Sequence, residues 1–552
     1  MSVPSRLACL FACVVAASPH LAAADPKTVC TITVNSPDEK QTFERYLPHA
    51  DYRFVELVEH GRPDWLASAC SNHVKCDALI ISGHFDGGTE FYTDRLDMRE
   101  SLPVHELERV SCSESCPGLF SQLKEVYLFG CNTLNAEAMR SASAEIVRSL
   151  VRSGHSPADA ALLARMLGER YGESNRDRMR NIFKDVPVLY GFSSKAPLGH
   201  VARPLLERYF ESAPPGEVAS GRISPRLLTL FAPSSMTVAS GSTESDPHVA
   251  FRRDVCQFAD DRLTEAQKVA FMHDVLRRDA ADVRMFLDHL EQYSSTLGPE
   301  QRQAPTTAAA LAEIASDQAA RRRYLEFMHD ADHPGIRARM IAFAQDIGWL
   351  TPADGRSEFL LMISEQVKRN AVGSTEVDLV CARERDPVLG SALLELPAAS
   401  PKSGRVANAA MLACLGNNDA RARVLQALTG ADDDEASIAQ LYLRHRPLTD
   451  ASDIRAIMAR IARMPRSEGQ VHALDTLAGQ SVADPESLQE LARLFPVARS
   501  VHVQRAIAGI LIRSDYRMLA RNDLAQSLRR TRLRSPDGED VIDALIRRLQ
   551  AP

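Results

Sequence analysis

Two short apolar runs in the first third of the chain each stop abruptly at a residue that can take part in catalysis. The run "ALIISGHF" at 78–85 ends at His84 and Phe85, and "EVYLFGCNT" at 125–133 is centred on Cys131. A continuous apolar run of this length predicts a strand buried on both faces, as in a parallel sheet. Chemistry in such sheets lies just beyond the carboxyl ends of the strands. The pattern therefore predicts one sheet edge that carries an imidazole and a thiol, the minimum for a cysteine nucleophile with a general base.

The segments around these runs alternate between strand and helix patterns. Strands are expected at 28–35, 52–58 and 77–85, with helices at 37–47 and 63–72 between them. This β-α-β-α-β order implies parallel strands and a doubly wound sheet. Further along, the expected elements are a hairpin at 89–94, short helical pieces at 104–110 and 118–123, and helices at about 135–152 and 156–172. Ser156 is a plausible N-cap of the last helix, with Pro157 in its first turn.

The second half of the chain has only helical periodicity. From about residue 252 to the end, apolar positions recur at helical spacing, and four similar helices are expected at 406–416, 436–447, 471–479 and 501–513. Their aligned alanines step by 30, 34 and 33 residues, and they are Ala409, Ala439, Ala473 and Ala506. Periods of this size are typical of an α-solenoid, and the pattern resembles HEAT-type repeats. An irregular helical bundle is the alternative.

The segment between the two halves has a different composition. Residues 213–247 are rich in Pro, Gly, Ser and Ala around the short apolar stretch "RLLTLF". Such a composition indicates a linker or a mobile lid. The expected domains are therefore 25–212, a linker at 213–251, and a helical domain at 252–552.

The first 24 residues have the features of a secretory signal peptide. Arg6 precedes an apolar stretch at 7–17, and small residues up to Ala24 suit cleavage. A lipoprotein box ending at Cys13 is the alternative, but little apolar sequence precedes it. No later stretch is long and apolar enough for a transmembrane helix. For a bacterial source, the mature protein is expected to be periplasmic or secreted.

The cysteine count supports an unpaired thiol. Of eleven cysteines, two belong to the signal peptide, and an odd number remains in a compartment where disulfides are expected. Cys131 is the candidate for the free thiol, whereas Cys414 is interpreted as a small buried apolar residue. No CxxC motif or paired histidine accompanies the cysteines, so no metal site is expected. The pairs close enough to bridge locally are Cys70 with Cys76 and Cys112 with Cys116.

His84 lies 47 residues before Cys131, close to the caspase spacing of about 50. Together with "IISGHF", "VYLFGCNTLN" and "VPVLYGFSSKAPLG" at 186–199, this makes residues 28–212 resemble the caspase-like fold, in particular its CHAT-type branch. The resemblance implies an α/β three-layer domain with a mostly parallel sheet. The fold class expected for the whole chain is this domain followed by an all-α helical-repeat domain.

The resemblance also implies roles for the site residues. Cys131 attacks a scissile carbonyl as its thiolate, and His84 protonates the leaving amine and then activates water. The Cys131 amide is the expected oxyanion donor. In the family a Gly usually follows the His and supplies the second donor, whereas Phe85 follows it here and Gly83 precedes it. At Gly130, where caspases proper carry Ala, either residue is expected to fit.

Several neighbours have more than one interpretation. Asn132 and Thr133 orient the site or, as the commoner role, cap the following helix. His200 is a candidate for approaching the sheet edge. Asp86 orients His84 or is a turn residue. Two preferences for the substrate side chain remain open. Lys195 would favour an acidic side chain. Four acidic residues would instead favour a basic side chain, and they are Asp86, Glu90, Asp94 and Asp97.

Composition narrows the functional classes. A net charge of −7 over 552 residues argues against nucleic-acid binding. The chain contains no P-loop, GxSxG or HExxH motif, which leaves nucleotide, serine-hydrolase and zinc-peptidase chemistry without support. The first hypothesis is an exported cysteine endopeptidase that acts on proteins or peptides without a cofactor, with a helical domain that binds a partner or regulates. Rival hypotheses are an inactive caspase-like binding scaffold and a thiol that is controlled by oxidation through Cys112 and Cys116.

Overall fold

The structure is a computed structural model that divides between Leu311 and Ala312 into two compact units, each described by itself below. The expected signal peptide lies outside the described residues. The described residues are 25–57, 66–85, 88–93, 100–113, 116, 118–137, 143–152, 154–171, 174–212, 216–246, 249–331, 333–383, 386–396, 405–465, 467–480, 482, 484–514, 521–533 and 541–550.

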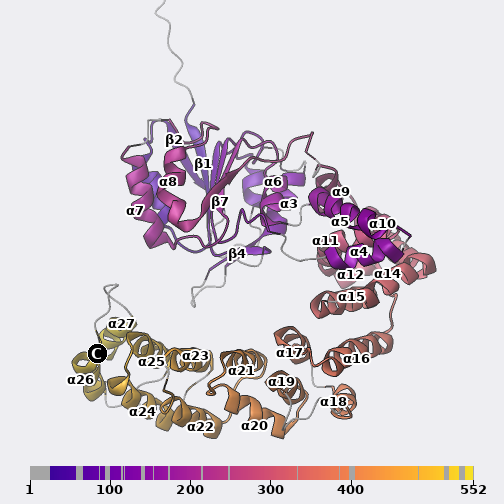
Figure 1. Ribbon diagram of the computed structural model, residues 1–552. Coiled ribbons are helices and arrows are strands. Elements are labelled where there is room, and N and C mark those ends of the chain that lie inside the picture. Colours follow the sequence, from indigo (N-terminus) through magenta and orange to yellow (C-terminus); the bar gives the residue numbers. More distant parts are fainter. Residues whose placement is uncertain are drawn as a thin grey trace, which may run out of the picture. The chain divides into compact units, whose positions relative to one another are not determined.

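The first unit is built around a six-stranded sheet with the order β2-β1-β3-β6-β7-β8 (Figure 1). The first five strands of that order pair in parallel, and β8 is antiparallel to β7. The continuous apolar runs therefore form a mostly parallel sheet, as the sequence predicts. The strands are β1 (Lys27–Thr33), β2 (Tyr52–Glu56), β3 (Ala78–Ser82), β6 (Glu125–Phe129), β7 (Val188–Phe192) and β8 (Met236–Ala239).

Helices cover both faces of this sheet. Because side chains alternate along a strand, Ile80 and Tyr127 face one core and Ile81 and Leu128 face the other. The first core packs against α1 (Asp38–Tyr46), α7 (Gly199–Phe210) and α8 (Pro225–Phe231). The second packs against α2 (Ala67–Ser71), α3 (Val104–Cys112) and α6 (Asn175–Ile182). Burial on both faces explains why the central strands carry no polar alternation.

The segment expected to be a linker is folded over residues 216–246. Leu227 and Phe231 of α8 are fully buried against the sheet, and β8 pairs with β7 at its edge. The buried carboxylate of Glu125 accepts hydrogen bonds from the N–H groups of Ala219, Ser220 and Gly221, which fixes the turn before α8. Buried apolar contacts and satisfied backbone groups thus replace the linker interpretation for these residues.

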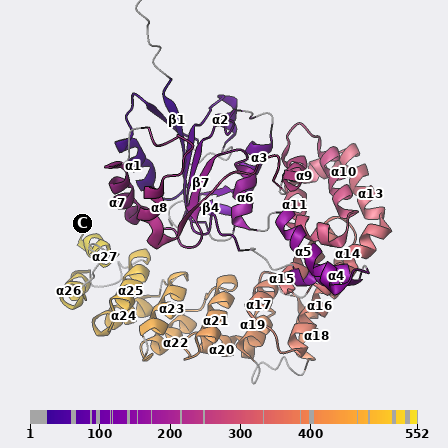
Figure 2. The ribbon, with the colours of Figure 1, turned by 45° about the horizontal axis from the view of Figure 1, so that its top comes forward.

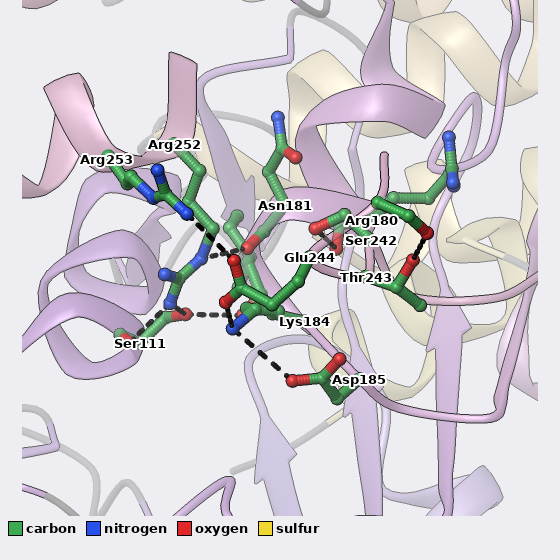
Figure 3. A network of polar contacts seen from close by, with 12 residues as sticks. Ser111, Arg180, Asn181, Lys184, Asp185, Ser242, Thr243, Glu244, Arg252 and Arg253 are labelled. Carbon is green, nitrogen blue, oxygen red and sulfur yellow. Dashed lines mark hydrogen bonds and ion pairs between the residues drawn. The ribbon is translucent and has the colours of Figure 1, made fainter. Parts of the chain in front are cut away.

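A polar network ties the segment after β8 to α3 and α6 (Figure 3). Arg252 donates to the carbonyl oxygen of Asn181 at 2.9 Å and to that of Ser111 at 2.8 Å. Glu244 pairs with Lys184 and with Arg253. Arg252 lies in α9 (Val249–Ala259), the first helix of the long helical part of the chain. The network therefore joins α9 to the sheet domain.

Two helices between β6 and β7 lie apart from the sheet. These are α4 (Ser143–Arg152) and α5 (Pro157–Tyr171), which pack on each other and on α11 (Ala280–Thr296). The N-cap expected at Ser156 is confirmed, since its Oγ accepts the Asp159 N–H at 3.2 Å. The helix expected from about Asn135 begins only at Ser143 among the described residues, because residues 131–134 form a turn. Residues 118–123 likewise form turns and not a helix.

The remaining elements of the first unit are short or helical. The hairpin expected within 89–94 is not found there: these residues contain the single strand β4 (Glu90–Tyr92), which pairs antiparallel with β5 (Ser101–Pro103). Three further helices follow α9 in the sequence, one before and two after α11. The last of them runs across the division between the units. They are α10 (Glu265–Leu276), α12 (Pro299–Gln303) and α13 (Pro305–Ser316).

Beyond α13 every element of the second unit that the structure describes is helical (Figure 2). The odd-numbered helices from α17 to α27 pack each on the next, so the region is built by sequential stacking of neighbours. The four helices expected from the repeat pattern are confirmed as α19, α21, α23 and α25. Of their aligned alanines, Ala409, Ala439 and Ala473 are buried, whereas Ala506 is half-buried and Ala508 takes the buried position.

The bounds of these helices are α14 (Gln318–Asp330), α15 (Pro334–Asp346), α16 (Pro352–Lys368), α17 (Ser374–Cys381), α18 (Pro387–Leu394), α19 (Val406–Cys414), α20 (Asn418–Ala427), α21 (Asp433–His445), α22 (Ala451–Ile461), α23 (Ser467–Ala478), α24 (Pro485–Leu494), α25 (Val501–Arg513), α26 (Arg521–Thr531) and α27 (Val541–Gln550). Over the described residues, none of the helices combines the length and the apolar character that a membrane crossing requires.

Four disulfides are found among the described residues, and they correct the expected pairing. They join Cys30 to Cys76, Cys70 to Cys116, Cys112 to Cys256, and Cys381 to Cys414. The expected local pairs are wrong because the folded chain gives their cysteines other neighbours. Cys30 of β1 meets Cys76, which precedes the adjacent strand β3, and Cys112 of α3 meets Cys256 of α9. Cys414 is buried as expected, but it bridges α19 to α17.

Candidate active site

His84 and Cys131 lie at the same edge of the sheet. Their strands, β3 and β6, are parallel neighbours in the centre of the sheet, and Ser82 is in register with Phe129. Each strand is followed by a glycine and then by the candidate residue, so both side chains leave the sheet at its carboxyl edge. Both residues line one open cavity of about 40 Å³. The convergence that the two apolar runs predict is therefore present.

The backbone of His84 is fixed by β4. His84 donates its N–H to the Tyr92 carbonyl at 2.8 Å and accepts the Tyr92 N–H at 2.9 Å. The imidazole lies beside the Tyr92 ring, with ring centroids 5.4 Å apart. A histidine anchored in this way is half-buried and still reaches the cavity.

Cys131 is the unpaired cysteine among the described residues, as the cysteine count predicts. It is half-buried, and its Sγ accepts the Ala196 N–H at 3.3 Å, which holds the sulfur at the wall formed by the loop after β7. Among the described residues, no acceptor is found for the Cys131 N–H. That amide is therefore available as a donor to an oxyanion, as expected for this position.

The turn after Cys131 is held by two hydrogen-bonded neighbours. Asn132 has a φ of 60°, in the left-handed region, and its N–H donates to Ser194 O at 2.6 Å. The Thr133 hydroxyl donates to Gly130 O and accepts the Phe192 N–H, each at 3.1 Å. Both residues shape the turn that presents Cys131. The expected capping role is wrong, because the next described helix begins at Ser143.

Gly83 and Gly130, which directly follow β3 and β6, allow close packing at the strand ends. A Cβ at Gly83 would lie 3.2 Å from Val34 Cβ, and one at Gly130 would lie 2.8 Å from Phe85 Cβ. The expectation that alanine fits at position 130 is therefore wrong in this chain. Phe85 is buried against Phe91, with ring centroids 4.6 Å apart. Its side chain belongs to the core, and it does not line the cavity.

The sequence analysis did not identify a carboxyl group in the cavity. Glu39 lies in the first turn of α1, is 2% exposed, and contacts the Ser82 hydroxyl at 2.9 Å. Its burial raises the pKa of the Glu39 carboxyl to about 7. Nothing in "PDEKQTFERYL" separates this glutamate from its solvent-facing neighbours. Only its position just after the first strand places it at the sheet edge.

Of the remaining candidate residues, those that the structure describes do not line the cavity. Lys195 and His200 are exposed, and Glu90 is half-buried on β4. Asp86, Asp94 and Asp97 lie outside the described residues. The cavity is lined by Asn35, Ser36, Glu39, Ser82, Gly83, His84, Phe129, Gly130, Cys131, Ala196, Pro197, Leu198 and Gly199.

The geometry brings together a thiol, an imidazole, an available backbone N–H and a buried carboxyl group. Within the described part of the chain, no three His, Cys, Asp or Glu side chains are arranged to hold a metal ion. The arrangement is suited to nucleophilic attack on a carbonyl group. No protein-family model matches the chain, and no curated protein or solved structure matches it either.

Proposed function

We propose that the protein is an exported cysteine endopeptidase with a caspase-like, CHAT-type first domain, in which Cys131 and His84 form the catalytic dyad. The observation that carries the proposal is their shared cavity at the ends of two adjacent parallel strands. It is supported by the cysteine pattern, since every other described cysteine is in a disulfide. A thiol kept free in an exported protein rich in disulfides requires a reason, and catalysis supplies one.

The mechanism follows from the positions of three groups. The Cys131 thiolate attacks the carbonyl carbon of a peptide bond, and the Cys131 N–H donates to the oxygen that becomes negative. His84 gives its proton to the departing amine, which leaves an acyl-enzyme thioester. His84 then takes a proton from water, the hydroxide attacks the thioester, and the Cys131 thiolate leaves beside the protonated His84. No step needs a metal or an organic cofactor.

The test is labelling of the folded, purified protein by peptide-based thiol-reactive probes. We expect labelling that maps to Cys131 and disappears in Cys131→Ala. His84→Ala should slow labelling roughly 100-fold, within the range for loss of a general acid–base group. His200→Ala is the matched control, because His200 is exposed and outside the cavity. Labelling of wild type and Cys131→Ala to the same extent contradicts the proposal.

A second candidate is a binding scaffold whose caspase-like domain is inactive. Phe85 favours it, since it occupies the position of the family's usual glycine and is buried in the core. The stacked helices α17 to α27, which resemble HEAT-type repeats in sequence pattern, would then supply a protein-binding surface. In this case Cys131→Ala and His84→Ala leave function intact. Loss of function in both variants excludes the scaffold alternative.

A further inference from the structure

Among the described residues that line the cavity, Glu39 is the one acidic side chain, and none is a lysine or an arginine. Glu39 supplies the carboxyl group, and the remaining walls are small, polar or apolar apart from His84. Glu39 and Cys131 line the same cavity, so a ligand that reaches the thiol can also reach the carboxyl group. A buried carboxyl group without a cationic partner is costly to ionise.

The two contacts of the Ser82 hydroxyl accommodate a protonated Glu39 carboxyl group. Ser82 Oγ lies 2.9 Å from Glu39 Oε2 and 3.0 Å from Ser36 O. Serine has one hydroxyl proton, so it cannot donate to both oxygens. Both contacts are satisfied when Glu39 donates to Ser82 Oγ and Ser82 donates to Ser36 O. Burial favours this neutral form and raises the Glu39 pKa to about 7, against the hydrogen bonds from its own N–H, Ser82 and Ser36, which lower it.

The charged groups around Glu39 are engaged elsewhere. Asp38, its neighbour on α1, lies 3.6 Å from Arg203 of α7, and Lys40 pairs with Glu56 at 2.9 Å. Arg203 also pairs with Glu207 on its own helix at 3.2 Å. On the β3 side, the titratable groups facing the cavity are His84 and, from β6, Cys131. No described cation neutralises Glu39, which leaves that interaction to a ligand.

Resting on the proposed peptidase activity, we propose that Glu39 selects substrates with a lysine or arginine side chain at the residue whose carbonyl group Cys131 attacks. The ammonium or guanidinium group enters the cavity, displaces the proton of Glu39 and forms a charge-assisted hydrogen bond with the carboxylate. Ser82 then donates to Glu39 in place of Ser36 O. An acidic side chain finds no lysine or arginine among the described lining residues, because Lys195 is exposed and outside the cavity.

The experiment compares matched peptides that carry lysine or its neutral analogue norleucine at that residue. Wild type should cleave the lysine peptide with the higher kcat/KM, and Glu39→Gln should reduce the lysine-to-norleucine ratio roughly 10- to 100-fold. Glu44→Gln, a change on the same helix outside the cavity, should leave the ratio unchanged. An unchanged ratio in Glu39→Gln, or a wild-type preference for norleucine, overturns the proposal.

A pH series separates recognition by charge from a structural role. Because lysine binds the ionised carboxylate, the ratio in wild type should fall about tenfold per pH unit below the Glu39 pKa of about 7. A pH effect on the chemical step is common to both peptides and cancels in the ratio. Glu39→Gln should give a flat ratio. A wild-type ratio that is independent of pH between 5 and 8 contradicts the proposal.

Binding to Cys131→Ala distinguishes failure of this proposal from failure of the peptidase proposal, since binding needs no turnover. If wild type cleaves nothing but Cys131→Ala binds the lysine peptide more tightly than the norleucine peptide, and Glu39→Gln removes the difference, the peptidase proposal fails and the basic-side-chain site stands. Equal binding of the two peptides overturns the site, whatever the activity of the wild type.

Discussion

The Cβ that an alanine would add at Gly130 lies 2.8 Å from the Cβ of Phe85. Such an approach is shorter than carbon atoms tolerate, and a Cβ has no rotamer by which to escape. Phe85 after the histidine and Gly130 before the cysteine are therefore one packing solution. A buried phenylalanine at the end of β3 requires a residue without a side chain at the end of β6.

Gly130→Ala should destabilise the protein by about 1–3 kcal/mol, the range for overpacking a core. It should also slow probe labelling of Cys131, because the displaced backbone carries the nucleophile. Urea unfolding monitored by circular dichroism measures the first effect. Gly118→Ala is the control, since its Cβ would come no closer than 3.4 Å to the flexible Lys75 side chain and 3.6 Å to the Val74 carbonyl oxygen. Equal stabilities of the two variants contradict the packing argument.

Alkylation of the folded, unreduced protein followed by peptide mapping should label Cys131 and leave the eight bridged cysteines unmodified. The most diagnostic product is a cross-linked peptide that joins Cys112 to Cys256, which are 144 residues apart. Peptides that join Cys112 to Cys116 contradict the structure. A bridge from Cys131 to either of them supports oxidative control of the thiol.

The sequence predicts the centre of the fold well because the central strands are buried on both faces. That environment demands unbroken apolar runs, and parallel pairing then brings His84 and Cys131 to one edge without further information. The same logic fails at the edge of the sheet. The short apolar stretch that holds Leu227 and Phe231 is surrounded by Pro, Gly and Ser, and only the docked β7 strand makes β8 possible.

Tertiary contacts decide the features that the sequence leaves open. Disulfide partners depend on which elements are neighbours, so nearness in sequence is a poor guide to Cys70 and Cys112. Glu39 looks like any glutamate of a surface helix. Its burial depends on the close approach of α7, where a Cβ at Gly199 would lie 2.0 Å from Ser36 Oγ. No local pattern in the first turn of α1 records that approach.

Glu39 should make the stability of the protein depend on pH. Its pKa is raised from 4.5 to about 7 in the folded state, so folding favours the protonated form. The contribution of Glu39 to stability is therefore fully present below pH 4.5 and is lost as pH rises through 7. The loss is about 3 kcal/mol, at 1.36 kcal/mol per pKa unit.

Glu39→Gln removes this titration and keeps a group that donates to Ser82. Relative to wild type, its unfolding free energy should therefore increase by about 3 kcal/mol between pH 4.5 and pH 8.5. Urea denaturation at the two pH values measures the difference. Glu44→Gln, on the same helix, serves as the control and should show little such change. A constant difference between Glu39→Gln and wild type contradicts the raised pKa.

Arg178 connects the loop after His84 to the body of the domain. Its Nε donates to Glu108 at 2.7 Å, and its Nη1 donates to the Gly88 carbonyl at 2.8 Å. Burial alone would raise the pKa of Glu108, but the adjacent guanidinium of Arg178 holds that pKa below its ordinary value. Glu108 is therefore charged, and removing Arg178 leaves a buried carboxylate without its partner.

Arg178→Met should cost about 3–5 kcal/mol, the usual range for breaking a buried ion pair from one side. Glu108→Leu combined with Arg178→Met should cost less than the sum of the two single changes, because no unpaired charge remains.

Gly88 lies between His84 and β4, so Arg178→Met should also slow probe labelling of Cys131, and the double variant should not restore it. Unfolding free energies of the three variants and labelling rates measured under fully folded conditions test both parts. Additive costs contradict the pairing, and normal labelling in Arg178→Met shows that Arg178 stabilises the fold without positioning His84.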